Sequence, residues 1–123
     1  MGGVLNARAG TFALARAGVP NPVYIPAAGE PTALTVPGPF LGTPNTAYQT
    51  LTGTLGSGDR LLMGTDGTRP DGAPTPGGPD RLLEVAGKHR ALAGEEFVDA
   101  VARELLQQAR HADDFTLLGL EML

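Results

Sequence analysis

The sequence contains no cysteine, no tryptophan and a single serine, Ser57. Without cysteine there are no disulfide bonds and no thiolate metal ligands. With no disulfides and no signal-peptide pattern at the N-terminus, we expect a cytoplasmic protein. The one serine lies in a glycine-rich turn, so no serine is placed for a catalytic triad. No apolar run approaches the roughly 18 residues that a membrane helix needs, and we therefore expect no membrane partner.

Positive charge is also scarce, since 9 Lys and Arg face 13 Asp and Glu, for a net charge of −4. This balance argues against a broad nucleic-acid surface. The 123 residues, 41% of them hydrophobic, are enough for one domain with a modest core. The 18 glycines and 11 prolines fall mostly in short clusters, which indicates many tight turns.

The first half of the chain predicts short strands. Residues 11–18 alternate large side chains with alanine, and residues 22–25 follow after a Pro-Asn turn, which predicts a hairpin. Further strands are predicted over residues 32–36, 47–55 and 60–65. Together these segments predict an antiparallel meander.

The second half predicts helices. Residues 67–80 hold four prolines and four glycines and predict a long loop. Helices are predicted over residues 80–92 and 94–110, the second with acidic residues in its first turn, as the helix dipole favours. The residues of its apolar stripe recur every four positions: Phe97, Val101 and Leu105. A final strand, from Phe115 onward, closes the chain.

Two carboxylates stand at predicted strand ends. Asp66 follows the strand of residues 60–65, and Asp113 precedes the final strand. If the final strand returns beside residues 60–65, the two carboxylates come close together, because antiparallel neighbours place the end of one strand beside the start of the next. Converging carboxylates suit Mg²⁺ or Mn²⁺. A plain turn is the alternative, since Asp-Gly is a common turn dipeptide and spacing alone favours the turn.

Three other polar residues have structural interpretations. His89, between Lys88 and Arg90, predicts a solvated helix face. His111 fits an exposed helix end, with metal ligation as the alternative. Asp59 is expected to cap or shape the turn that precedes its strand.

Two stretches, LGSGDRLLMGTDG at residues 55–67 and ADDFTLLGLEML at residues 112–123, resemble the PPM-type (protein phosphatase 2C) superfamily, in particular its stage II sporulation protein E-like branch. The residues that carry the resemblance are Gly58-Asp59, Thr65-Asp66-Gly67 and Asp113-Asp114-Phe115-Thr116. Residues 10–25 resemble a hairpin of the same family, and the match is collinear over nearly the whole chain.

The resemblance implies an α+β fold, part of an α-β-β-α sandwich in which antiparallel sheets are flanked by two helices. It implies a metal-dependent protein serine/threonine phosphatase of bacterial signalling. In this family two Mn²⁺ or Mg²⁺ ions activate a water that attacks the phosphorus of phosphoserine or phosphothreonine. By motif position Asp66 and Asp113 would be metal ligands, and Asp114 would lie beyond the direct ligands. No other catalytic or cofactor-binding residue is assigned.

The sequence also departs from the family. The Asp-Gly-x-Gly motif whose aspartate bridges the two metals is missing, and Val19 stands where relatives commonly have histidine. Residues 1–123 are therefore expected to be the C-terminal portion of the domain, without its N-terminal portion and with weak or no activity alone. Missing strands and helices would leave sheet edges and apolar faces uncovered, so we expect a homodimer or a complementing chain.

The expected partner is a phosphorylated protein, with an anti-sigma factor antagonist as the candidate that the resemblance suggests. The alternative function is a non-catalytic, phosphatase-like interaction module, in which the two aspartates only form turns. A third, plainer reading is a structural β-rich domain.

Overall fold

The structure is a computed structural model that describes residues 2–16, 20–35, 47, 49–65, 81–108 and 116–123. Within these ranges the elements, in chain order, are β1 (Gly2–Asn6), β2 (Thr11–Ala15), β3 (Val23–Ile25), β4 (Thr32–Ala33), β5 (Thr50–Thr54), β6 (Arg60–Gly64), α1 (Arg81–Lys88), α2 (Gly94–Gln108) and β7 (Leu117–Glu121). No helix in this part of the chain is long and apolar enough to cross a membrane.

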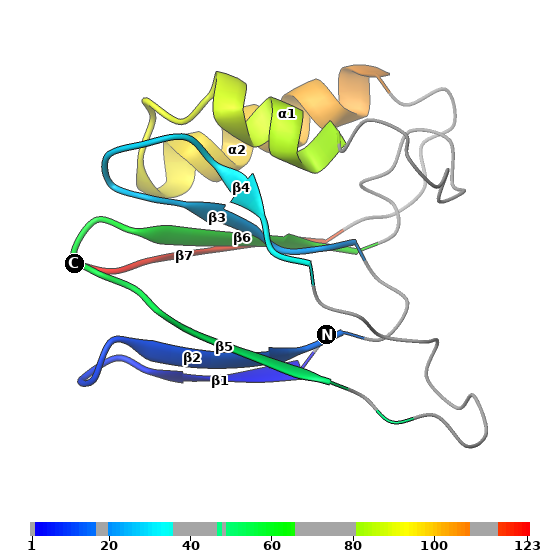
Figure 1. Ribbon diagram of the computed structural model, residues 1–123. Helices are drawn as coiled ribbons and strands as arrows, with labels where there is room; N and C mark the ends of the chain where they lie inside the picture. Colours follow the sequence, from blue (N-terminus) through cyan, green and yellow to red (C-terminus); the bar gives the residue numbers. More distant parts are fainter. Residues whose placement is uncertain (1, 17–19, 36–46, 48, 66–80, 109–115) are drawn as a thin grey trace.

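The strands form two antiparallel sheets that stack face to face (Figure 1). One sheet has the strand order β1-β2-β5 and the other β4-β3-β6-β7. Both helices cover the outer face of the four-stranded sheet, so the layers run helix, sheet, sheet. This arrangement confirms the expected α+β fold with two antiparallel sheets and two flanking helices.

The position of β6 in the middle of the molecule explains the apolar run in its sequence. Leu62 packs on the helices, together with Val23 and Ile25 of β3. Leu61, which points to the opposite face, packs against Phe12 and Leu14 of the other sheet. A strand buried on both faces reads as a continuous apolar run rather than as an alternation, and Leu61 and Leu62 are accordingly 1% and 0% exposed.

The helical layer follows the predicted apolar stripe. Phe97, Val101 and Leu105 of α2 are all buried, as expected from their spacing. Helix α1 ends at Lys88, before the predicted end at residue 92. A turn follows, in which the Leu92 amide donates a hydrogen bond to the His89 carbonyl. Gly94 begins α2 with a φ of 59°, a conformation that glycine adopts without steric cost.

Strand β2 of the three-stranded sheet turns its large side chains inward. Phe12 and Leu14 are buried, while the intervening residues face outward. Opposite Phe12 in the register lies Gly53, and a Cβ added there would come within 2.5 Å of the Phe12 ring. The glycine therefore lets the ring lie across β5.

The predicted hairpin between residues 11–18 and 22–25 is wrong. Strand β2 pairs with β1 and β5, whereas β3 pairs with β4 and β6, so the two segments belong to different sheets. Side-chain alternation identifies a strand but does not say which strand lies beside it. The single meander fails for the same reason, since the connection from β5 to β6 also passes between sheets.

Strand boundaries differ as well. Strand β1, Gly2–Asn6, was not predicted, because two glycines and only two large apolar residues give little strand signal. The strands found within residues 11–18, 32–36 and 47–55 are shorter than those ranges. The end of the helix predicted to residue 110 lies outside the described residues.

Candidate functional site

The candidate site begins where β6 ends and β7 starts. The two strands pair antiparallel, with Gly64 opposite Leu117. Beyond that pair, the Thr65 amide donates to the Thr116 carbonyl at 3.1 Å, and the Thr116 amide donates to Thr65 Oγ1 at 2.9 Å. This pairing confirms that the final strand returns beside residues 60–65.

The two predicted metal ligands, Asp66 and Asp113, lie outside the described residues, as do Asp114 and His111. What the structure gives is the position of their chain neighbours. Asp66 directly follows Thr65, and Asp113 precedes Thr116 by three residues. The structure therefore joins the two strand ends from which these acidic residues continue.

The two ligands expected from the sequence, Asp66 and Asp113, are of a type that suits a hard divalent cation. Both sequence candidates are carboxylates, and Mg²⁺ and Mn²⁺ prefer oxygen ligands while keeping several waters. Two carboxylates fill only part of a shell of about six oxygens, so water or another segment must supply the rest. Among the described residues there is no group of three or more His, Asp or Glu side chains that would form a rival metal site.

An apolar cavity of about 380 Å³ lies between the two sheets at the same end. Thr65 and Thr116 line it, together with residues of β1, β2, β6 and β7. Strands β1 and β7 are sheet edges, and each carries an exposed apolar side chain, Val4 and Leu118. Within the part of the chain that the structure describes, apolar surface is therefore exposed at these two strands and in the hollow between the sheets.

Asp59 has a structural role at the other end of β6. Its carboxylate accepts hydrogen bonds from the Ala27 amide, the Gly56 amide and the Tyr24 hydroxyl, each at 2.8 Å. The hydrogen bond from the Ala27 amide is the main cause that holds the pKa of Asp59 below its usual value, and the bonds from Gly56 and Tyr24 act in the same direction. Desolvation of the carboxylate opposes them. The hydrogen bond between Tyr24 and Asp59 raises the pKa of Tyr24. Asp59 shapes its turn, as predicted, and also ties that turn to β3.

Arg60 has a role that the sequence did not predict. Its guanidinium donates to the Leu92 and Arg90 carbonyls and lies 4.5 Å from the centre of the Phe97 ring. It thus holds the turn between α1 and α2 against the start of β6. Nearby, Arg90 pairs with Glu30, which lowers the pKa of Glu30 and raises that of Arg90. A lone arginine at a strand start carries no pattern that would reveal these contacts.

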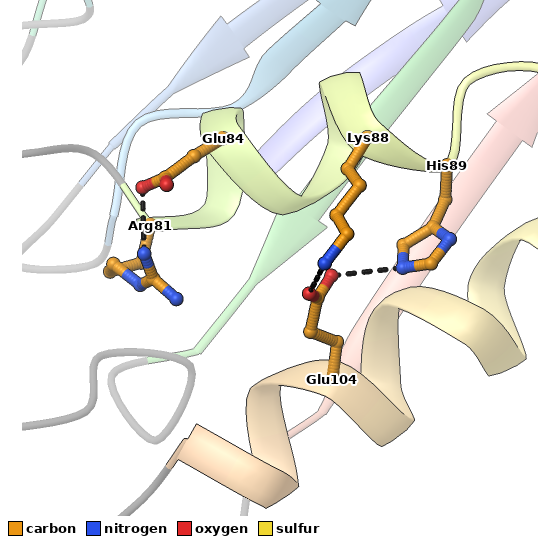
Figure 2. Close-up of polar contacts among 5 residues, drawn as sticks. All are labelled: Arg81, Glu84, Lys88, His89 and Glu104. Carbon is orange, nitrogen blue, oxygen red and sulfur yellow. Dashed lines mark hydrogen bonds and ion pairs between the residues drawn. The ribbon is translucent and has the colours of Figure 1, made fainter.

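Glu104 joins the end of α1 to α2 (Figure 2). Its carboxylate pairs with the Lys88 ammonium and, at 2.9 Å, with His89 Nε2. Lys88, with His89 as a smaller cause, lowers the pKa of Glu104. The solvated helix face predicted for His89 is therefore wrong, because its ring bonds to Glu104 and is only 24% exposed. Figure 2 also shows the separate Arg81–Glu84 pair within α1.

Similarity to one known protein family extends over the whole chain. The sequence profile of the family described as stage II sporulation protein E (SpoIIE) matches residues 1–123. No sequence among the curated proteins matches significantly.

Among solved structures, the chain is similar to the RsbU and RsbW domains of Rv1364c from Mycobacterium tuberculosis, with 25% identity, a TM-score of 0.79, and coverage of 97% of this chain and 34% of that one. It is also similar to the phosphatase domain of the cell fate determinant SpoIIE from Bacillus subtilis, with 16% identity, a TM-score of 0.68, and coverage of 98% and 56%. RsbX in complex with magnesium gives 21% identity, a TM-score of 0.58, and coverage of 94% and 51%. The chain thus spans between about a third and just over half of these proteins.

Proposed function

Because the chain belongs to the stage II sporulation protein E family, we propose that it is the C-terminal portion of a metal-dependent protein serine/threonine phosphatase domain. The observation that carries the proposal is the pairing of Thr65 with Thr116. It joins the two strand ends that continue into Asp66 and Asp113, the residues at the family's metal-ligand positions.

Asp66 and Asp113 would hold Mn²⁺ or Mg²⁺ through carboxylate oxygens. Two of the similar structures support this choice of metal, since one is of RsbX with magnesium and one is of the SpoIIE phosphatase domain soaked with manganese. A bound divalent cation lowers the pKa of a coordinated water and neutralises charge on a phosphoryl group. The role proposed for this chain is to hold the cation at the end of the two sheets where Thr65 and Thr116 lie.

The proposed substrate is a phosphoserine or phosphothreonine residue of a protein. The similar Mycobacterium tuberculosis structure contains an RsbU and an RsbW domain of one protein, which supports a partner from a regulatory system. An anti-sigma factor antagonist is the partner class proposed here, in cytoplasmic signalling.

We propose that this chain alone has weak or no activity. It lacks the Asp-Gly-x-Gly motif, so a bridging carboxylate must come from elsewhere. The apolar cavity and the open edges of β1 and β7 offer the place for further strands. A complementing segment or a second copy of the chain would cover them.

A non-catalytic interaction module is the second candidate. The missing Asp-Gly-x-Gly motif favours it, and so do the exposed apolar side chains Val4 and Leu118 on the two strand edges. In that case the same edges would bind a regulator, and the aspartates would have no metal to hold.

Calorimetric titration of the chain with Mn²⁺ tests the proposal. We expect the wild-type chain to bind, and Asp66→Asn and Asp113→Asn each to abolish tight binding with little loss of stability, since asparagine keeps the turn. Asp71→Asn is the matched control, because it removes a carboxylate from the same predicted loop and should bind Mn²⁺ like the wild type.

Absence of binding at millimolar Mn²⁺ would contradict the phosphatase proposal and favour the interaction module. If Asp66→Asn instead unfolds the chain, Asp66 serves the turn rather than a metal. Release of phosphate from a phosphothreonine peptide gives the second measurement. We expect it to be weak or absent for residues 1–123 and to appear on addition of a segment that carries Asp-Gly-x-Gly.

A further inference from the structure

A second pocket, of about 230 Å³, lies at the end of β6 away from the candidate metal site. Its walls come from the turn between β3 and β4, from the first residue of β6 and from the turn between α1 and α2. These segments lie at the same end of the four-stranded sheet (Figure 1). Three charged side chains line this pocket, which we call the Arg60–Arg90 pocket: Glu30, Arg60 and Arg90.

Arg60 is already fixed in position at the pocket wall. Its guanidinium donates to the carbonyls of Leu92 and Arg90 and lies over the Phe97 ring. A guanidinium has five N–H donors, and these two hydrogen bonds use two of them. Because the side chain is ordered by these contacts, a ligand that binds to it loses little further side-chain entropy.

Arg90 has a partner that a ligand can replace. Its guanidinium pairs with the carboxylate of Glu30, and the two side chains are 44% and 81% exposed. Exposed ion pairs contribute little to stability, so the cost of separating this one is small. The Ala27 amide, which also lines the pocket, already donates to Asp59. The arginine side chains are therefore the donors that the pocket offers to a ligand.

We propose that the Arg60–Arg90 pocket binds a phosphate group, which displaces the Glu30 carboxylate from Arg90. The planar fork of a guanidinium matches the oxygens of a phosphate, and a phosphate carries more negative charge than one carboxylate. The volume suits inorganic phosphate or the end of a phosphorylated side chain, since sites for larger ligands begin at roughly 300 Å³. This inference goes beyond the proposed function and does not depend on it, because no residue of the pocket is a proposed metal ligand.

Titration of the metal-free chain with inorganic phosphate, followed by NMR of the backbone amides, tests the proposal. Phosphate replaces chloride at constant ionic strength, so that general screening by salt does not change. We expect saturable shifts of the Glu30 and Arg90 amide signals. Arg90→Gln should weaken binding by about fivefold or more, because it removes a charged donor. Glu30→Gln should tighten binding by about two- to fivefold, because it removes the competing carboxylate.

Glu84→Gln is the matched control. It makes the same change of charge in another exposed pair, with Arg81, and neither residue lines the pocket. Phosphate affinity should therefore stay at the wild-type value. Equal tightening by Glu84→Gln and Glu30→Gln would assign the effect to net charge and overturn the proposal. Unchanged affinity in Arg90→Gln, or no saturable shift in the wild-type chain, would also overturn it.

A phosphothreonine peptide and its unphosphorylated form separate the two sources of the phosphate group. Tighter binding of the phosphorylated peptide than of inorganic phosphate would assign the pocket to a phosphorylated protein, and the reverse order would assign it to free phosphate. A chain that binds phosphate here but binds no Mn²⁺ would contradict the proposed function and leave this pocket assigned.

Discussion

The carboxylate of Asp59 accepts a hydrogen bond from the hydroxyl of Tyr24 at 2.8 Å, although the two residues are 35 positions apart in the sequence. The same carboxylate accepts from the amides of Ala27 and Gly56. The Asp59 side chain thus bonds the start of β6 to Tyr24 of β3, to the residues just after β3 and to the turn after β5. That turn connects the two sheets. The Gly-Asp motif at positions 58 and 59 therefore has a structural role at the end of β6 away from the candidate metal site.

Asp59→Ala is expected to destabilise the chain by about 1–3 kcal/mol, because two backbone amides and a tyrosine hydroxyl lose a charged acceptor. Tyr24→Phe removes only one of the three bonds and should cost about 1 kcal/mol. Urea unfolding followed by circular dichroism measures both free energies. Equal costs for the two variants would contradict the view that the backbone amides are the main partners of Asp59.

The chain should lose stability in acid in part through Asp59. Its pKa is lower in the folded state than the ordinary value of 3.8, so the unfolded state takes up the proton first as the pH falls. The stabilising contribution is therefore fully present above pH 3.8 and is lost as the pH falls through the lower, folded pKa.

Unfolding free energies measured across this acidic range test the point, with Asp59→Asn as the variant. We expect a shallower acid dependence in Asp59→Asn than in the wild type. Identical slopes would mean that other carboxylates, such as Glu30 and Glu104, account for the acid dependence, since their pKa values are also lowered.

Leu62→Ala is expected to destabilise the chain by about 2–5 kcal/mol, because it opens a cavity between β6 and the helices. Leu62 is fully buried, whereas Leu118 on the adjacent strand is 53% exposed. Leu118→Ala is therefore the matched control, with an expected cost below about 1 kcal/mol. Thermal or urea unfolding measures both. A large cost for Leu118→Ala would show that the open edge of β7 is covered in solution, for example by a second copy of the chain.

Glu104→Gln should lower stability more than Glu84→Gln. Glu104 bridges α1 and α2 through two partners, and its side chain is largely buried between them, whereas Glu84 makes one exposed pair with Arg81 within a single helix. Exposed pairs within a helix contribute little. Thermal unfolding at low salt and in 1 M NaCl measures both variants. The difference between them should shrink at high salt, because ions screen the Lys88 pair; a difference that salt leaves unchanged would assign the effect to the hydrogen bonds alone.

The sequence by itself determined the elements that have a strong period or a fixed motif. The four-residue recurrence of Phe97, Val101 and Leu105 specified α2 and its buried face, because only one side of a helix meets the sheet. The strand predicted over residues 60–65 corresponds to β6, whose Leu61 and Leu62 are buried on opposite faces. The motifs around Asp66 and Asp113 indicated the family, and the expected return of the final strand beside residues 60–65 was correct.

Only the tertiary structure decided which strands are partners. Strands β2 and β3 are neighbours in sequence yet lie in different sheets, because alternation fixes the face of each residue and leaves its partner open. The contacts of Asp59 with Tyr24, of Arg60 with Leu92 and of Glu104 with His89 join residues 35, 32 and 15 positions apart, and no local pattern records such distances. The tie from the Thr65 hydroxyl to the Thr116 amide spans 51 positions and exists only once β6 and β7 have paired. Local sequence patterns determined the strands and helices, and packing between distant segments determined which side chains come into contact.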